Sequence, residues 1–449
     1  MEIPIRDYFD SALKKLKAES IPDIIKGVKG TSNKEHVIEH LVKGILRAKY
    51  DVYVNKDGTI RYDMTQLPIT HFKPKEVCAD VEKLLRIGYL NDIYGQPLTN
   101  EEQILELKPQ DIILPCAKES PDEGADTVLH RIAGFIDELL LRLYGQKAFY
   151  RLESEKDLIG HYVIVIAPHT SAGIVGRIVG FSQTQGLYAH PMLHAATRRD
   201  TDGDEAGIIL LMDALLNFSK KYLPSNLGST QDEPLVLTSN LIPTEIDDMI
   251  FDMDICWEYP VELYEAAQNL KMPHEIEIKQ VSKLLKTDNM YGPIGFTHHV
   301  ENMNTGVKCS AYKTLPTMQD KLKAQMELAE KIRAVDEADV ARLVIEKHFL
   351  RDIKGNFRKF SQQVFRCGNC NEKYRRPPLI GRCTKCNGKI IFTISEGSII
   401  KYLEPAISLA NKYNLPPYLK QSLEITKISI ESIFGKEREK QIELKKWFG

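Results

Sequence analysis

Two Cys-x-x-Cys pairs limit how this chain can fold more than any other feature of its sequence. Cys367 and Cys370 form the first pair, Cys383 and Cys386 form the second, and twelve residues separate the pairs. Each pair presents two thiolates on one side of a turn, and two such turns complete a tetrahedral four-sulfur site that suits Zn²⁺. Disulfides are the alternative, but this paired spacing in an intracellular chain argues against them. The sequence therefore predicts a structural zinc module.

A second cluster of possible metal ligands lies near the middle of the chain. Asp200, Asp202 and Asp204 alternate with other residues in the stretch Arg-Arg-Asp-Thr-Asp-Gly-Asp-Glu-Ala. Compact groups of carboxylates bind hard cations such as Mg²⁺. Three like charges this close together are unfavourable unless a cation offsets them. A magnesium site and a solvated acidic turn are the two interpretations.

The residues after the three aspartates decide against a calcium-binding loop. Such a loop needs Gly at its sixth position and Glu at its twelfth, where this chain has Glu205 and Leu211. The apolar run 206–212 follows directly, so we expect the acidic turn to be anchored to a buried element. A rigid support of this kind is what a metal site requires.

The segment from Gly160 to Gly207 contains APHTSAGIVGRIVGF, QGLYAHPMLHAATRRD and DGDEA in this order. It resembles the catalytic region of the large subunit of archaeal D-family DNA polymerase. The resemblance continues in colinear order over essentially the whole chain, through SAYKTLPTMQD, NFRKFSQQ and FTISEGSIIKYLEPA. It implies an α+β fold with a double-psi β-barrel of the two-barrel polymerase type, helical insertions, a C-terminal zinc module and a helical tail.

The resemblance also implies a reaction, template-directed addition of deoxynucleotides to a DNA primer–template. Asp202 and Asp204 match the family's catalytic pair, while Asp200 stands where the family can have Asn. Together they would hold two Mg²⁺ ions, which activate the primer 3′-hydroxyl and stabilise the leaving pyrophosphate. Arg198 and Arg199 either hold phosphates by charge-assisted hydrogen bonds or act as a local counter-charge to the acidic turn.

Basic residues surround the four cysteines. Between Lys347 and Lys389 there are twelve Lys or Arg and two acids, a local charge of +10, whereas the whole chain has a net charge of −2. Such a patch binds the phosphate backbone by releasing counterions. A partner-subunit surface is the alternative. The candidate DNA contacts here are Arg366, Arg375 and Arg376. Lys313, in a loop before a predicted helix, is either a further phosphate contact or an ordinary surface lysine, and the second interpretation is preferred.

The last residues match the motif with which replication proteins bind the sliding clamp. In the motif, a glutamine is followed by an aliphatic residue and two aromatic residues, here Gln441, Leu444, Trp447 and Phe448. This spacing places the three apolar side chains on one side of a helical turn, as anchors for a groove. A terminal helix docked on its own domain is the alternative.

The resemblance further implies partners. The family's basic motif for the first barrel is not found in this chain, so we expect a split-gene product or a fragment, corresponding to the C-terminal part of the large subunit. We expect polymerase activity only after assembly with the N-terminal part and with a small subunit that is a 3′–5′ exonuclease. The alternatives are a non-catalytic scaffold that binds zinc and the sliding clamp, and a piece of an RNA polymerase, which the clamp motif disfavours.

Composition is ordinary for a globular protein, with 43% hydrophobic and 27% charged residues. No apolar run approaches the roughly 18 residues that a membrane helix requires. The N-terminus lacks the apolar segment of a signal peptide. We therefore expect a soluble, cytoplasmic protein with no membrane contact.

The pattern along the chain predicts five regions. They are a mixed α/β region that contributes to the barrel (1–150), the catalytic barrel region (151–260), a helical region (261–350), the basic zinc module (351–400) and the helical tail with the clamp motif (401–449).

Several elements are predicted from local patterns. Asp57-Gly58 in the middle of residues 51–62 predicts a β-hairpin, and apolar spacing predicts a helix over 127–145. We expect the glycines of 173–180 to serve helix packing. Thr317 is expected to cap a helix.

His190 and His194 are four residues apart and would line up as metal ligands on a helix. Pro191 between them and the lack of an adjacent Glu argue against a metalloprotease site. Structural or DNA-backbone roles are the preferred interpretation.

Overall fold

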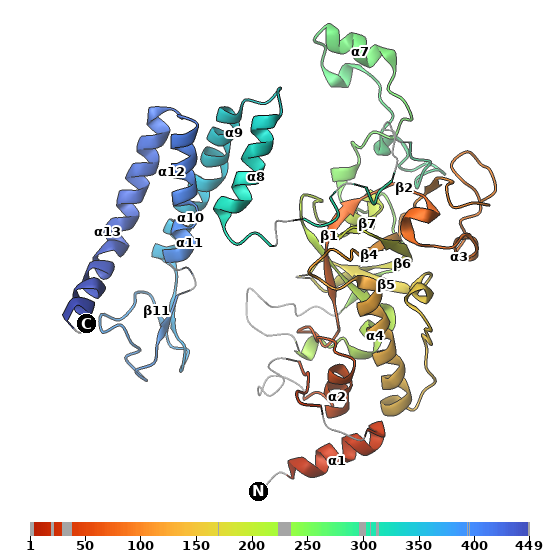
Figure 1. Ribbon diagram of the computed structural model, residues 1–449, viewed down its shortest axis with the longest axis horizontal. Helices are drawn as coiled ribbons and strands as arrows, with labels where there is room; N and C mark the ends of the chain where they lie inside the picture. Colours follow the sequence, from red (N-terminus) through yellow and green to blue (C-terminus); the bar gives the residue numbers. More distant parts are fainter. Residues whose placement is uncertain are drawn as a thin grey trace. The chain divides into compact units, whose positions relative to one another are not determined.

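The computed structural model describes residues 4–18, 22–28, 38–168, 170–222, 235–295, 302–305, 307–310, 314–392, 394 and 396–447. The chain divides into two compact units, Met1–Ser310 and Ala311–Gly449 (Figure 1). Both units contain helices and strands, so the α+β prediction is confirmed. The boundaries of the five predicted regions stay predictions.

Six strands of the first unit close into a barrel. Their order around it is β4–β7–β1–β8–β5–β6, and β6 pairs with β4 to complete the circle. The pairs β1–β7 and β4–β6 are parallel and the other four are antiparallel. The closed barrel agrees with the prediction, while the double-psi crossing pattern stays a prediction. The strands are β1 (Tyr62–Pro68), β4 (Asp111–Pro115), β5 (Tyr162–Ile166), β6 (Ala172–Ser182), β7 (Leu187–Ala189) and β8 (Glu205–Leu210).

Helices pack around the barrel through one continuous apolar core. It joins inward-facing side chains of the strands to α1 (Ile5–Leu16), α2 (Leu41–Lys49) and α4 (Ala125–Leu139). Leu129, Ile132 and Ile136 of α4 are fully buried, at the three- and four-residue spacing that predicted this helix. A π-helical turn, η2 (Leu140–Tyr144), continues α4.

The glycines of 173–180 lie in strand β6, so the helix-packing prediction is wrong. A Cβ atom on Gly180 would come within 2.4 Å of the Val77 carbonyl oxygen, and one on Gly173 within 2.3 Å of Ile164 Cγ2. Glycine in a strand marks close approach of a neighbouring segment. These glycines let adjacent backbone and side chains pack directly on β6.

The predicted hairpin over 51–62 is also wrong, although its turn is present. Gly58 N–H donates to the Asn55 oxygen at 3.1 Å, but regular strand structure begins only at Tyr62. Within the described part of the chain, this backbone does not pair with another strand. Hydrogen bonds to buried side chains fix it instead. Asp57 accepts a hydrogen bond from Thr59 N–H at 2.9 Å.

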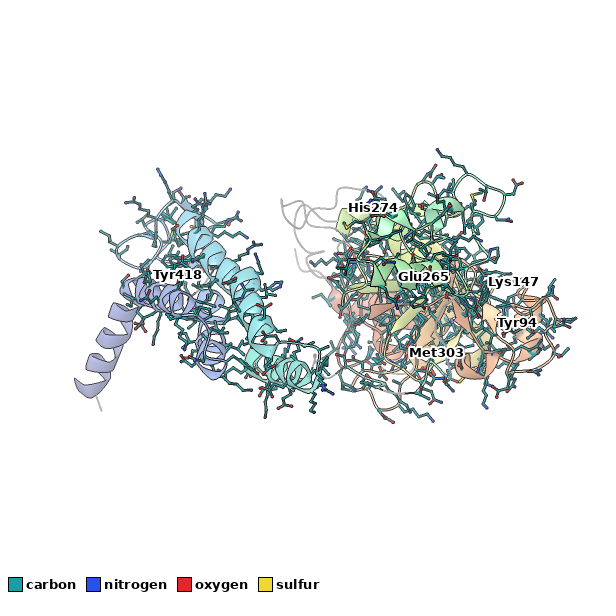
Figure 2. The ribbon with its side chains drawn as sticks, turned by 90° about the horizontal axis from the view of Figure 1, so that it is seen from above. Tyr94, Lys147, Glu265, His274, Met303 and Tyr418 are labelled. Carbon is teal, nitrogen blue, oxygen red and sulfur yellow. The ribbon has the colours of Figure 1, made fainter. Side chains whose placement is uncertain are left out.

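Smaller elements flank the barrel. β2 (His71–Phe72) and β3 (Leu105–Glu106) pair and, with η1 (Pro74–Val77) and α3 (Val81–Arg86), enclose a second core. β9 (Val236–Thr238) adds to β6. α7 (Val261–Gln268) lies at the far end of an excursion from the barrel (Figure 1), where Glu265 and His274 are exposed (Figure 2). The remaining short helices are η3 (Glu155–Leu158), α5 (Pro191–Ala196), α6 (Leu211–Asn217), η4 (Lys220–Tyr222), η5 (Asp248–Ile250), η6 (Pro273–Glu275) and η7 (Val281–Lys283).

The second unit packs its helices around a separate core that includes Leu322, Ile345 and Leu419. The Thr317 hydroxyl accepts from Asp320 N–H at 3.1 Å, so the predicted cap is confirmed. Among helices of the described residues, none has both the length and the apolar character to cross a membrane. The elements are α8 (Met318–Lys331), α9 (Glu337–Leu343), η8 (Val344–Phe349), α10 (Leu350–Gln362), β10 (Phe365–Cys367), β11 (Lys373–Tyr374), β12 (Ile390–Ile391), α11 (Glu396–Ile400), α12 (Leu403–Lys412) and α13 (Pro417–Trp447).

Candidate active site and metal centre

The three aspartates lie in a loop between α5 and β8, which we call the carboxylate loop (residues 197–204). Asp200 and Asp202 are exposed, and Asp204 is partly buried where the loop enters β8. Gly203 has a φ of 117°, a conformation that side chains rarely adopt, so glycine is required between the last two aspartates.

The strand that follows supports the carboxylate loop. Residues 206–210 of β8 are buried, and β8 pairs with β1 on one side and β5 on the other. The acidic turn is therefore anchored to the middle of the barrel sheet, as the apolar run predicted. Backbone positions at the end of the loop are fixed by the barrel rather than by the loop itself.

The two arginines before the aspartates differ in their surroundings. Arg199 Nε lies 2.9 Å from Asp204 Oδ2, with both side chains about one-third exposed or less. Arg198 is exposed and has a φ of 55°, so the chain leaves α5 through a left-handed residue. Arg199 thus acts as a counter-charge to the loop in this structure, and Arg198 faces solvent.

The carboxylates do not form a tight cluster. Across the described part of the chain, the one group of at least three potential metal ligands whose atoms all lie within 4.8 Å of one another is the cysteine group. Like charges close together disfavour ionisation unless a cation offsets them. Three carboxylates on an exposed, strand-anchored loop are nonetheless the donor set that suits Mg²⁺.

His190 and His194 are buried within the fold. His190 accepts a hydrogen bond from Met192 N–H at 3.0 Å and caps α5. His194 Nε2 lies 3.1 Å from the Leu67 oxygen of β1. Burial lowers the pKa of His190 to about 3 and that of His194 to about 4, so both rings are neutral. These contacts support the structural interpretation.

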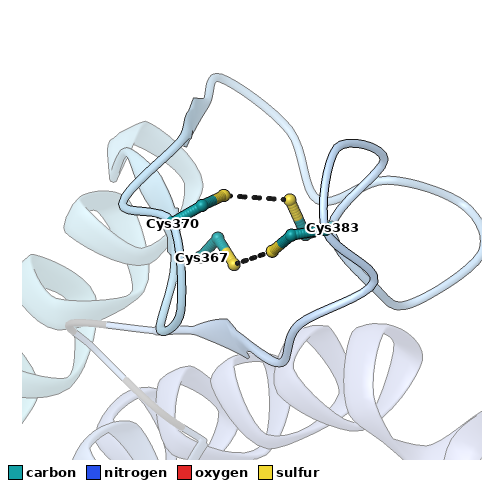
Figure 3. Close-up of side chains that lie close together, drawn as sticks. Cys367, Cys370 and Cys383 are labelled. Carbon is teal, nitrogen blue, oxygen red and sulfur yellow. Dashed lines mark hydrogen bonds between the residues drawn. The ribbon is translucent and has the colours of Figure 1, made fainter.

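The four cysteines converge in the second unit (Figure 3). Cys367 Sγ lies 3.3 Å from Cys386 Sγ, and Cys370 Sγ lies 3.5 Å from Cys383 Sγ. The Tyr374 hydroxyl, 3.1 Å from Cys383 Sγ, lowers the pKa of that thiol to about 6. Sulfur atoms gathered in this way could hold a metal ion such as Zn²⁺.

Arg366, Arg375 and Arg376, which we call the basic surface, are exposed around this cysteine cluster. Within the described residues, none of the three forms an ion pair. Their charges are therefore available to an anionic partner. Lys313 lies outside the described residues.

The clamp motif falls at the end of α13, whose first turn is marked by the exposed Tyr418 in Figure 2. Gln441, Leu444 and Trp447 belong to this helix, while Phe448 lies outside the described residues. The side chains of the motif are likewise not described. Its role stays a prediction.

Sequence reasoning missed the residues that hold the carboxylate loop in place. Gln66 of β1 contacts both ends of the loop, through Thr197 and through the backbone of Asp204. No local pattern marks Gln66, because its partners lie more than a hundred residues away in the chain.

Comparison with known proteins identifies the family of this chain. A family model described as "DNA polymerase II large subunit DP2, catalytic domain" matches residues 18–321. The chain belongs to this family. The resemblance to the archaeal D-family polymerase large subunit is thereby confirmed.

Individual relatives agree with the family assignment. A protein named "DNA polymerase II large subunit" from Archaeoglobus fulgidus is 50% identical over 445 residues, 99% of this chain and 38% of the relative. Proteins of the same name from Nanoarchaeum equitans and Pyrococcus furiosus are each 49% identical, over 98% and 95% of this chain and 36% and 33% of their own lengths. The chain thus spans little more than a third of the curated relatives that it matches.

Proposed function

We propose that this chain supplies the magnesium-binding barrel of a DNA polymerase. Asp202 and Asp204, with Asp200, would hold the metal ions for transfer of deoxynucleotides to a primer–template. The observation that carries this proposal is the carboxylate loop, in which Asp200 and Asp202 are exposed, Asp204 is partly buried, and a buried barrel strand follows directly. Membership of the DNA polymerase II large-subunit family supports it.

In this proposal the protein holds and orients the reactants. Two Mg²⁺ ions, when bound, lower the pKa of the primer 3′-hydroxyl and neutralise the phosphates of the nucleotide and the leaving pyrophosphate. Asp204 is fixed by its junction with β8, while Asp200 and Asp202 face the solvent from which substrates arrive. Arg199 would exchange its pairing with Asp204 for a nucleotide phosphate, and Arg198 would bind a second phosphate.

Substitution of the aspartates tests the catalytic role. Asp202→Ala and Asp204→Ala should each lower the rate of primer extension by about 100-fold or more, because they remove ligands of the metal ions that would stabilise the negative charge of the transition state. The measurement is single-nucleotide incorporation by the chain assembled with the rest of its large subunit and the small subunit. Asp122→Ala removes another exposed aspartate and should leave the rate unchanged.

A non-catalytic scaffold is the second candidate. The observation that favours it is the ion pair between Arg199 and Asp204, which occupies one of the proposed ligands. Extension at the wild-type rate by the Asp202→Ala complex would establish the scaffold and exclude the catalytic proposal.

The cysteine cluster and its surroundings would serve a second purpose. We propose that Cys367, Cys370, Cys383 and Cys386 hold a structural Zn²⁺. The basic surface beside it would bind the DNA backbone by counterion release. Its exposed arginines lack ionic partners among the described residues, which supports this role.

Assembly completes the proposal. The rest of the large subunit would provide the second barrel, and a small exonuclease subunit and the sliding clamp would join the complex. The clamp would be bound through Gln441, Leu444, Trp447 and Phe448. The chain alone would extend primers poorly, because it corresponds to little more than a third of its relatives.

A further inference from the structure

Gln66 connects the two ends of the carboxylate loop. Its side chain is fully buried in strand β1. The Gln66 backbone N–H donates to the Asp204 carbonyl oxygen at 2.9 Å, at the end of the loop. Its side-chain Nε2 donates to the Thr197 hydroxyl at 3.3 Å, at the beginning of the loop. One residue of the barrel therefore sets the distance between the ends of the loop.

Thr197 is held in an orientation that suits this contact. Its hydroxyl donates to the His194 carbonyl oxygen at 2.7 Å, so the hydroxyl oxygen remains to accept from Gln66. His194 Nε2 in turn lies 3.1 Å from the Leu67 oxygen, on the residue after Gln66. The end of α5 is thus attached to β1 at two consecutive residues.

The strand that provides these contacts is a rigid reference. β1 pairs with β7 in parallel at Gln66 and with β8 in antiparallel at Thr65. Both flanking strands belong to the closed barrel. Movement of the loop ends relative to the barrel therefore requires these hydrogen bonds to break.

The chemistry of Gln66 favours a task beyond filling the core. Its side-chain Oε1 is buried and has no hydrogen-bond partner among the described residues. An unsatisfied buried acceptor costs stability that an apolar residue of the same size would avoid. The amide is better explained by the hydrogen bond that its Nε2 donates to Thr197.

We propose that Gln66 and Thr197 are positioning residues for the cation held by Asp202 and Asp204. By fixing the ends of the carboxylate loop, they limit how far these two carboxylates can separate. This role rests on the proposed function, and neither residue touches the cation or substrate. Groups that orient metal ligands typically change metal affinity by about 10- to 100-fold when they are replaced.

Metal binding by the full chain tests the proposal directly. Mn²⁺ serves as the probe, and electron paramagnetic resonance measures the free ion. Gln66→Met keeps the side-chain volume and removes the amide, while Thr197→Val keeps the shape and removes the hydroxyl. Each should weaken Mn²⁺ binding by about tenfold. Thr197→Ser keeps the hydroxyl and should bind like wild type, and the double variant should be no weaker than either single one.

Gln110→Met provides the matched control. Gln110 also bridges parts of the first unit, donating to the Val175 oxygen at 2.6 Å and accepting from Leu241 N–H at 3.0 Å, but it does not contact the carboxylate loop. Its replacement should leave Mn²⁺ affinity unchanged. A loss as large as that in Gln66→Met would mean that general damage to the barrel explains the effect, and would overturn the positioning role.

The remaining outcomes separate this inference from the proposed function. Wild-type affinity in Gln66→Met and Thr197→Val, with binding lost in Asp202→Ala, would refute the positioning role and leave the catalytic proposal standing. If Asp202→Ala binds Mn²⁺ as tightly as the wild type does, both the positioning role and the catalytic proposal would be refuted. If Gln66→Met does not fold, the contrast between Thr197→Val and Thr197→Ser decides.

Discussion

Asp213 is a fully buried carboxylate on α6, the helix that directly follows strand β8. Its two oxygens accept hydrogen bonds from Ile60 N–H and from the Asn217 side chain, each at 2.7 Å. Burial nevertheless raises its pKa from 3.8 to about 6. Desolvation outweighs these hydrogen bonds, so the ionised form is less favourable in the folded chain than in the unfolded one.

This pKa predicts a pH dependence of stability with a definite sign. Below pH 3.8 Asp213 is protonated in both states and carries no penalty. As the pH rises towards 6 the unfolded chain releases the proton first, so the free energy of unfolding falls, by about 3 kcal/mol in all. Asp213→Asn should remove this decline, measured by urea unfolding of the first unit between pH 4 and pH 7.

Asp157 offers a control, because its pKa is shifted in the opposite direction. Its pKa is lowered to about 2, chiefly by the hydrogen bond from Lys83, so its contribution is lost as the pH falls. Asp157→Asn should therefore leave the decline between pH 4 and pH 7 in place. Equal slopes for wild type and Asp213→Asn would contradict the prediction.

At the scale of elements, replacing glycine by alanine should have opposite effects on stability in β6 and in α10. In Gly180→Ala of β6, the new Cβ would meet the Val77 backbone oxygen at 2.4 Å, which should lower the stability of the barrel by about 1–3 kcal/mol. In Gly355→Ala of α10, nothing lies within 4 Å of the new Cβ, and better helix propensity should raise stability by about 1 kcal/mol. Both changes in stability can be measured by hydrogen exchange at increasing denaturant concentration, which reports on each unit separately. An increase in stability in Gly180→Ala would disprove the close packing of β6.

At the scale of the whole molecule, the two units have separate cores and should respond separately to loss of metal. Structural zinc contributes folding free energy directly. A chelator should therefore abolish hydrogen-exchange protection in residues 365–391 and leave the barrel strands protected. Cys383→Ser should reproduce this effect, and Cys256→Ser, at a cysteine outside the cluster, should not. Loss of protection in both units would show that they are coupled.

The sequence by itself identified the family, the α+β class, the cysteine cluster and several helices. These succeeded because their signals are local: Cys383 and Cys386 are three residues apart, and the α4 side chains repeat every three or four residues. It failed where distant residues replace local partners. Asp57-Gly58 predicted a hairpin, but side chains such as Asp213 fix that backbone, and the glycines of β6 were misassigned because only the neighbouring segments show why glycine is needed.

The candidate site divides in the same way. The proposed magnesium ligands lie within five residues of one another, so the alternation of Asp200, Asp202 and Asp204 predicted a cation site without any fold. Only the tertiary structure decided what holds them, since the Gln66–Thr197 hydrogen bond joins residues 131 apart in the chain. Closure of the barrel brings these residues together, and strand pairing over such distances leaves no periodic pattern in the sequence.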